Sequence, residues 1–328
     1  MKISVALCTY NASRDHLGAQ LYSLAKQERL PDELIVCDDA STNETVELLR
    51  QADGLPFPTE IVVNDRNLGS TKNFEKAIGL CRGNVIALCD QDDYWHSTKL
   101  SRIESEFHAS PELGLAVSDA WLWDNYTLAM DNETSGGLAW SRLPFSPEMQ
   151  KRFNDRGGAD LMLRWNVVTG ATAAFRADLR PLLLPIPECW VHDAWIGFLA
   201  AAVAPAHAIA EPLVVYRQHL GQQIGIRPDT LYAQMNLARS RLTRGYFERQ
   251  VAEFEALAER LEANADRLLD KTLPSRVREK VRLAQTQARM RAIGRLPRLG
   301  LAIRELATGR YHRYARGLRS FGVDALFP

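Results

Sequence analysis

The feature that most constrains the fold is an alternation of short apolar runs with helical stretches over the first 120 residues. Four apolar runs end in polar residues and read KISVALCTYN, ELIVCDDAS, TEIVVND and GNVIALCDQDD. Between them, apolar residues recur at helical spacing in 16–27, 42–51 and 70–81. Continuously apolar strands separated by helices are typical of parallel sheets with helices on both faces. We therefore predict an α/β fold built from βαβ units around a parallel sheet.

The rest of the chain follows two other patterns. LGLAVSDAWLWD, VVTGATAAFR and AEPLVVYRQH predict strands, and HDAWIGFLAAAVA predicts a helix. Beyond residue 229, apolar residues recur at alternating spacings of four and three from Phe247 to Leu268, Pro274 interrupts them, and Pro297 separates a final basic segment. We predict one domain over 1–228 and a helical region over 229–328, with a hairpin at 231–292 and a basic tail at 293–328. The hairpin either packs within the molecule or forms a homodimer interface.

Charge is distributed unevenly along the chain. Residues 274–328 contain 13 Lys and Arg against three acids, so this part carries +10 and the remainder −10, since the whole chain is neutral. Basic segments that contain Tyr, Phe and Leu are attracted to anionic membranes, which predicts peripheral membrane association. The alternative is that these arginines pair with acids elsewhere in the chain. No nucleic-acid recognition motif accompanies the charge, so we expect no nucleic-acid partner.

The cysteines and the lengths of the apolar runs indicate the cellular compartment of the protein. Five cysteines form no CxxC pair, and three lie inside apolar runs, as expected for buried, reduced thiols. The first apolar run is too short for a signal peptide, and the later run at 195–204 is too short to cross a bilayer. We expect a cytoplasmic protein that docks at the inner face of the membrane through its tail.

The polar strand ends are the main indication of function. The carboxyl ends of parallel strands meet at one edge of a sheet, where ligands bind in such folds. So many carboxylates raise one another's pKa unless a cation shares the site, and their hard oxygens suit Mg²⁺ or Mn²⁺ bound with phosphate. Alternatively, Asp38, Asp39 and Asp93 cap the helices that follow them. The four strand ends carry Thr9-Tyr10-Asn11, Asp38-Asp39, Asn64-Asp65 and Asp90-Gln91-Asp92-Asp93.

These motifs resemble the family 2 glycosyltransferases with the GT-A fold. The resemblance rests on VALCTYN, LIVCDDAS, NDRNLGSTKNFEKA and CDQDDYW, and continues through TGATAAFR, HDAW and YRQH. The DQDD form and the ending GRYHRYARGLRSFGVDAL are similar to a bacterial rhamnosyltransferase-like branch. The resemblance implies a Rossmann-like α/β fold with a mixed, mostly parallel sheet flanked by helices, and a C-terminal helical extension. It also implies an inverting, metal-dependent transferase in cell-surface polysaccharide synthesis. It would move a sugar from dTDP-rhamnose or a UDP-hexose to a saccharide or lipid-linked saccharide hydroxyl.

The resemblance also implies a nucleotide site. The ring of Tyr10 would stack on the base, and Asp39 would accept a hydrogen bond from its imide N–H. Asp90 would hold the ribose or the metal ion. Lys72, just inside a helix, would meet a phosphate, or is a solvated surface lysine. The nucleotide-binding residues are thus Thr9, Tyr10, Asn11, Asp39, Lys72 and Asp90.

Metal and diphosphate contacts are implied for two further segments. Asp92 would be the metal ligand that bridges to the diphosphate, and His219 a second ligand or a structural histidine. Arg217 is a candidate for the diphosphate, and Asp93 would support the site or the local turn. The loop after His219 departs from the branch, because Gln222 and Gln223 stand where an asparagine is usual.

The last implied role is that of a general base. Asp193 would take the proton of the acceptor hydroxyl as its oxygen attacks the anomeric carbon, and a single displacement inverts that centre. His192 would orient Asp193 or is simply half-buried, and Gly170 would let the backbone approach the acceptor. Alternatively, Asp193 caps the following helix.

Two other classes of protein remain as alternatives. A nucleotidyltransferase would share the carboxylates and the metal ion, but LCTYNASRDH lacks the glycines of its usual loop. A non-catalytic binding protein with the same sheet would have no need of Asp92 and Asp193.

Overall fold

The computed structural model describes residues 1–51, 54–124, 137–218 and 243–326. The chain divides into two compact units, which we call the sheet unit (1–159 and 167–226) and the helical unit (160–166 and 227–328). The predicted boundary at 228 falls among residues 219–242, outside the described residues.

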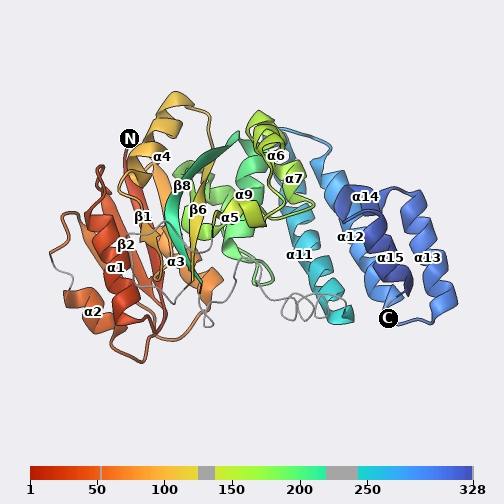
Figure 1. The fold of residues 1–328 in the computed structure, drawn as a ribbon, viewed down its shortest axis with the longest axis horizontal. Helices are drawn as coiled ribbons and strands as arrows, with labels where there is room; N and C mark the ends of the chain where they lie inside the picture. The colour runs from red at the N-terminus through yellow and green to blue at the C-terminus, as the bar shows by residue number, and fades with distance from the viewer. Residues whose placement is uncertain (52–53, 125–136, 219–242, 327–328) are drawn as a thin grey trace. The chain divides into compact units, whose positions relative to one another are not determined.

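The sheet unit is built on one mixed sheet of eight strands within the described residues (Figure 1). β1, β2, β3 and β4 pair in parallel, β7 runs antiparallel between β4 and β6, and β8 is parallel to β6. This confirms the predicted mixed, mostly parallel α/β fold. In spatial order the strands are β3 (Thr59–Val63), β2 (Glu33–Asp38), β1 (Ile3–Thr9), β4 (Val85–Cys89), β7 (Ala173–Arg176), β6 (Leu115–Asp124), β8 (Ala206–Gln218) and β5 (Tyr94–Trp95).

Helices cover both faces of this sheet because alternate strand residues point to opposite sides. On one face, Ile3, Val5 and Leu7 of β1 join a core with apolar residues of α1 (Arg14–Ala25) and α4 (Lys99–Ala109). α3 (Ser70–Leu80) packs on β1 and β2, and α9 (His192–Val203) packs on β6 and β7. The shorter helices are α2 (Thr45–Gln51), α5 (Ala139–Arg142), α6 (Pro147–Arg152), α7 (Gly158–Met162) and α8 (Arg180–Leu183).

The helix boundaries remove one alternative from the sequence. α2 begins at Thr45 and α4 is preceded by Thr98, while Asp93 leads directly into β5. Asp38, Asp39 and Asp93 therefore do not cap the helices that follow them. Their carboxylates need another explanation.

The helical unit contains the predicted hairpin, formed by α11 (Arg244–Glu262) and α12 (Leu273–Met290), which pack against each other. The expected continuation of the first helix to Leu268 is wrong. α11 ends at Glu262, where the Asn264 side chain donates to the Arg260 carbonyl and satisfies one terminal acceptor (2.9 Å). Pro274 lies in the first turn of α12, where proline is tolerated, so it begins a helix and does not interrupt one.

The basic tail forms three helices, α13 (Arg295–Ala307), α14 (Arg310–Tyr314) and α15 (Leu318–Leu326). Pro297 lies in the first turn of α13, so the prediction that it separates the basic segment from the preceding helix is wrong. Several arginines pair with acids of the helical unit itself: Arg291 with Asp324, Arg310 with Glu305, and Arg313 with Glu279. In the part of the chain that is described, no helix is long and apolar enough to span a membrane.

Candidate active site

The carboxyl ends of β1 and β2 are joined directly. Thr9 and Asp38 are paired in the sheet register, and the Thr9 hydroxyl donates to Asp38 Oδ2 (2.8 Å). Asp38 also accepts hydrogen bonds from the backbone N–H and the hydroxyl of Ser41 (2.8 and 2.6 Å). Asp38 thus orients the turn after β2. The Thr9 hydroxyl and the Thr9 carbonyl, which accepts from Asp39 N–H, both have partners within the protein.

Tyr10 is held by a residue of the DQDD motif that the sequence analysis did not single out. Its backbone N–H donates to Gln91 Oε1 (2.8 Å), and Gln91 Nε2 donates back to its carbonyl (3.2 Å). Asn11 takes a left-handed φ of 44°, and its side chain accepts from Thr42 N–H (2.8 Å). The Tyr10 side chain, 48% exposed, is presented on a clamped backbone, as stacking on a base requires.

Asp39 organises the loop that leads into α3. Its Oδ1 accepts from the Leu68 N–H (2.7 Å) and from Asn64 Nδ2 (2.9 Å), and its Oδ2 accepts from the Gly69 N–H (2.9 Å). Gly69 has a φ of 81°, which favours glycine. The predicted hydrogen bond to a base would use the remaining acceptor capacity of this carboxylate.

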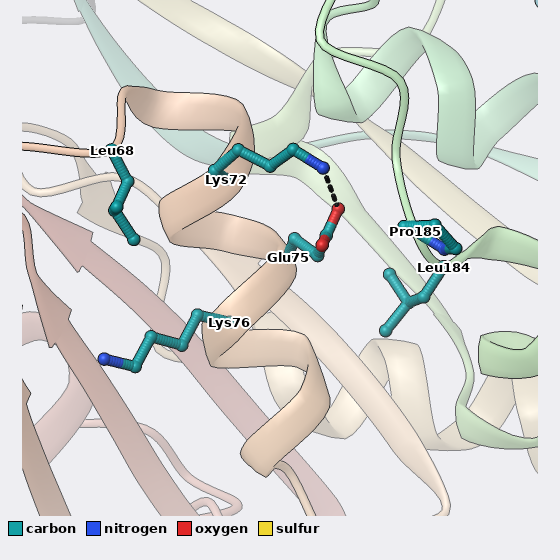
Figure 2. A pocket seen from close by; sticks show the side chains of 6 residues that line it. All are labelled: Leu68, Lys72, Glu75, Lys76, Leu184 and Pro185. Atoms are coloured by element: carbon teal, nitrogen blue, oxygen red, sulfur yellow. Dashed lines mark hydrogen bonds and ion pairs between the residues drawn. The ribbon is translucent and has the colours of Figure 1, made fainter.

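Lys72 belongs to a groove of about 650 Å³ beside α3 (Figure 2). Its ammonium group points at Glu75 Oε2 (2.9 Å) and also donates to the Ile186 carbonyl (2.7 Å). Lys72 is therefore half-buried, and the solvated-lysine alternative is wrong. Its contact with a phosphate stays a prediction. The groove is lined by Leu68, Lys72, Glu75, Lys76, Leu184 and Pro185.

Three aspartates follow β4 in an acidic loop, which we define as residues 90–93. Burial, followed by the charges of Asp92 and Asp193, raises the pKa of Asp90 to about 7. Asp93 is 1% exposed, and burial with the neighbouring carboxylates raises its pKa well above the usual range. Its Oδ1 accepts from the Arg217 N–H (3.1 Å), whereas its Oδ2 has no hydrogen-bond partner among the described residues. The loop therefore concentrates negative charge that the protein only partly compensates.

Asp193 approaches this loop from another element. It is the second residue of α9, so it lies in the first turn and is not the residue that caps the helix. Oδ1 accepts from the Ala194 N–H (2.6 Å) and Oδ2 from the Gly170 N–H (3.0 Å). Burial raises its pKa to about 6, against these stabilising hydrogen bonds. A fixed carboxylate with this pKa can act as a general base near neutral pH.

Gly170 and His192 both lie close to Asp193. The Gly170 N–H donates to it, whereas the His192 imidazole makes no hydrogen bond to it. A Cβ at Gly170 would lie 3.1 Å from His192 Nε2, so glycine allows the close approach. The His192 ring stacks on Phe74, with centroids 4.0 Å apart, and neither ring nitrogen has a hydrogen-bond partner among the described residues. Burial lowers its pKa to about 3, so it is neutral. His192 therefore does not orient Asp193 through a hydrogen bond, and the prediction of such an orienting role is wrong.

Arg217 fixes the acidic loop from β8. Its Nε donates to the Asp92 carbonyl (2.9 Å), and its guanidinium lies 4.0 Å from the centroid of the Trp123 ring. Only 7% of Arg217 is exposed. A contact with a diphosphate stays a prediction, as does the role of His219, which lies outside the described residues.

Lys99 is the most important residue that the sequence analysis missed. It is fully buried, and its ammonium group lies 3.3 Å from the centroid of the Trp95 ring and donates to the Ala171 carbonyl (2.5 Å). Burial lowers its pKa to about 7, while the charges of Asp93 and Asp90 oppose that shift. Lys99 thus connects the acidic loop with the turn that carries Gly170. A lysine in the first turn of an amphipathic helix gives no signal of such burial.

The acidic loop fits a divalent cation that takes further ligands from a phosphate. In the described ranges, no three His, Cys, Asp or Glu side chains form a ready-made metal site. Asp90 and Asp92 nevertheless repel each other, and a cation would relieve that repulsion. Magnesium-type sites are commonly built from one or two carboxylates completed by substrate phosphates.

Comparisons with known proteins identify the family of this chain. The family model "Glycosyl transferase family 2" matches residues 4–179. The Escherichia coli protein "UDP-Glc:alpha-D-GlcNAc-diphosphoundecaprenol beta-1,3-glucosyltransferase WfaP" is 30% identical over 239 residues, which are 73% of this chain and 86% of that protein. The Bacillus subtilis "Putative teichuronic acid biosynthesis glycosyltransferase TuaG" is 31% identical over 30% of this chain, a match that spans only 39% of the relative.

A solved structure supports the fold. The crystal structure of S. aureus TarS 1-349 in complex with UDP-GlcNAc superposes with a TM-score of 0.58 at 14% identity, covering 99% of this chain and 82% of that one. The family model covers more than half of the chain and includes β1 to β4, whose ends carry the site. These findings do not show whether the chain belongs to the rhamnosyltransferase-like branch. The chain belongs to glycosyl transferase family 2, with the GT-A fold and additional C-terminal helices.

Proposed function

We propose that this protein is an inverting, metal-dependent glycosyltransferase. It would transfer a sugar from a nucleotide diphosphate sugar to a hydroxyl of a lipid-linked saccharide in cell-surface polysaccharide synthesis. The observation that carries the proposal is the convergence of Asp193 with the acidic loop. The charge of Asp193 raises the pKa of Asp90, although one carboxylate begins a helix and the other follows a strand.

The donor site is proposed at the ends of β1 and β2. Tyr10, clamped by Gln91, would stack on the base, and Asp39 would contact its imide. The relative WfaP is described as using UDP-Glc, so a UDP-hexose is the donor to test before dTDP-rhamnose. Lys72 and Arg217 would contact the diphosphate only after exchanging part of their present contacts.

Asp92, with Asp90 beside it, would hold Mg²⁺ or Mn²⁺. A bound divalent ion would neutralise the charge that develops on the departing nucleoside diphosphate. Asp93 would keep the loop in place through its contact with the Arg217 backbone. His219 stays a proposed further ligand.

Asp193 would act on the acceptor. The N–H groups of Gly170 and Ala194 hold its carboxylate in one orientation while its oxygens retain capacity to accept a proton. As the acceptor oxygen forms its bond to the anomeric carbon, its proton passes to Asp193 and the bond to the diphosphate oxygen breaks. A single displacement from the opposite face inverts the anomeric configuration.

The acceptor is proposed from the relatives. WfaP and the Escherichia coli protein WfgD are both described as acting on alpha-D-GlcNAc-diphosphoundecaprenol, and WfgD is 28% identical over 41% of this chain. A lipid-linked acceptor agrees with peripheral association of the basic tail with the cytoplasmic face of the membrane, which we retain as part of the proposal. We expect the hairpin of α11 and α12 to pack within the helical unit and not to form a homodimer interface.

Transfer assays test the proposal directly. The protein is incubated with Mn²⁺, a panel of UDP- and dTDP-sugars, and a GlcNAc-diphospho-lipid acceptor. We expect transfer from one donor, with loss of activity in Asp92→Ala and in Asp193→Ala. Asp178→Ala, at an exposed acid of the sheet unit, is the matched control and should remain active. Retention of full activity by Asp92→Ala and Asp193→Ala would refute the mechanism.

A further inference from the structure

Helix α13 exposes three of its apolar residues and buries two of its charged residues. Leu296, Leu299 and Ile303 are 84%, 41% and 52% exposed, whereas Arg298 and Glu305 on the inward side are each 3% exposed. An amphipathic helix of a globular protein normally buries its apolar stripe. α13 departs from this rule, because one apolar stripe stays exposed although Ala302 on the inward side is fully buried.

The exposed apolar residues form one continuous stripe. Positions 296, 299, 300, 303 and 307 fall on the same side of a helix with 3.6 residues per turn. They are occupied by Leu, Leu, Gly, Ile and Ala, and we call this set the α13 face. Arg295 and Arg304, both exposed, lie at its two edges.

The inward side of α13 is fixed by polar contacts. Glu305 accepts hydrogen bonds from Arg310 (3.0 Å) and from the Thr286 hydroxyl (3.2 Å). Because Glu305 is held in this way, α13 cannot rotate to bury its leucines without leaving this carboxylate exposed and its partners unpaired. The helical unit therefore keeps the α13 face outward. The neighbouring α15 adds Leu318 and Leu326, which are 64% and 68% exposed.

We propose that the α13 face docks on an anionic lipid bilayer surface. Apolar side chains would enter the boundary between headgroups and acyl chains, and Arg295 and Arg304 would contact lipid phosphates. Arginines close to an anionic membrane surface are attracted to it. The only acid of α13 is the buried Glu305, so the exposed charge of this helix is entirely positive.

Charge also distinguishes the bilayer from a second copy of the chain. In a symmetric dimer the same patch meets itself, so the arginines at the edges of one α13 face would approach those of the other. Like charges at such an interface are unfavourable. In an anionic bilayer, the boundary between headgroups and acyl chains can accept the apolar stripe, and the lipid phosphates can pair with the basic edges.

The docking proposal deepens the proposed function, and it rests on that function only for the lipid-linked acceptor. Vesicle flotation without donor or acceptor measures docking alone. We expect the protein to float with vesicles of phosphatidylcholine and phosphatidylglycerol, and much less with phosphatidylcholine alone. The triple variant Leu296→Ser/Leu299→Ser/Ile303→Ser should lose at least about tenfold in partitioning. Arg295→Gln/Arg304→Gln should lose the preference for the anionic lipid.

Matched controls separate docking from folding and from catalysis. Leu30→Ser/Leu269→Ser removes two exposed leucines elsewhere (38% and 40% exposed) and should float like the unmodified chain. Transfer to a water-soluble acceptor should be unchanged in the triple variant. Failure of the unmodified chain to float, or unchanged flotation of the triple variant, would overturn the proposal. So would a dimer in sedimentation that the triple variant converts to a monomer.

Discussion

The two units differ in how many hydrogen bonds a buried aspartate receives. In the helical unit, Asp324 is 1% exposed and receives hydrogen bonds from Gln287 (2.7 Å), from the Tyr311 hydroxyl (2.8 Å) and from Arg291. In the sheet unit, Asp93 is also 1% exposed, but it accepts one backbone hydrogen bond and faces other carboxylates. Asp324 thus receives three hydrogen bonds, one of them from a cation, whereas Asp93 receives one from the backbone, and burial raises the pKa of both carboxyls.

This difference separates a stabilising role from a binding role. Removing one partner of a buried charged pair is costly, so the contacts of Asp324 hold the helical unit together. An undercompensated acidic cluster costs stability and is typical of sites where a ligand supplies the missing charge. We therefore expect mutations of buried acids to reduce activity in the sheet unit and stability in the helical unit.

The largest effect is expected at Asp193. Asp193→Asn should lower kcat by about a thousandfold, because general-base catalysis contributes on this order. The free energy of unfolding should not fall, since the change removes a buried charge. Steady-state transfer and thermal denaturation measure the two quantities. A loss of activity that is matched by a loss of folded protein would contradict the assignment.

The opposite result is expected at Asp324. Asp324→Asn removes the carboxylate that pairs with the buried Arg291 and should lower the free energy of unfolding by about 3 kcal/mol. Transfer per folded molecule should stay close to that of the unmodified chain. Chemical denaturation measures the stability, and a large loss of kcat without a loss of stability would refute the division of roles.

Lys99→Met should have an intermediate effect on activity. The change removes the donor to the Ala171 carbonyl and the cation beside Asp90 and Asp93, so the turn that carries Gly170 is held less firmly. We expect kcat to fall by about tenfold to a hundredfold, and stability to fall by about 2 kcal/mol. Lys151→Met, at an exposed lysine of α6, serves as the control. Equal activities of the two variants would argue against the role of Lys99.

The pH dependence follows from the pKa of Asp193. Its usual value is 3.8 and its value in the folded protein is about 6, so kcat/KM should rise with pH through about 6 as the base ionises. The folded state holds this proton where the unfolded chain has lost it, so stability should decrease between about pH 4 and pH 6. Asp193→Asn should reduce that decrease. A pH-independent difference in stability between the two proteins would contradict the shift.

The smallest effect is expected at Gln91. Gln91→Ala removes both hydrogen bonds that clamp the Tyr10 backbone, so the KM for the donor should rise by about fivefold to tenfold with little change in kcat. Thr98→Ala, just before α4, provides a control outside the site. A change in kcat alone would argue that Gln91 acts on the reaction and not on donor binding.

The sequence predicts the sheet and the positions of its polar ends because both depend on local periodicity. Strand ends such as Thr9-Tyr10-Asn11 and Asp90–Asp93 can be identified without coordinates. The roles of single side chains depend on tertiary contacts and cannot be identified in this way. Lys99 is an example, because its burial beside Trp95 depends on how α4 packs on the sheet.

His192 and α13 illustrate the same limit. His192 precedes Asp193 in the sequence, yet its ring turns to Phe74 of α3. The tail arginines suggest a uniformly basic surface, but Arg310 and Arg313 pair with acids inside the helical unit. Only the structure shows that α13 keeps its leucines outward.

Calorimetric titration of UDP, with and without Mn²⁺, tests the central claim most directly. If the acidic loop binds a cation that also contacts the diphosphate, Mn²⁺ should tighten UDP binding by at least about tenfold in the unmodified chain. The same ion should have little effect in Asp92→Asn, whereas Asp324→Asn should behave like the unmodified chain once folded. UDP binding that is equally tight in EDTA, or an undiminished Mn²⁺ effect in Asp92→Asn, would contradict the account.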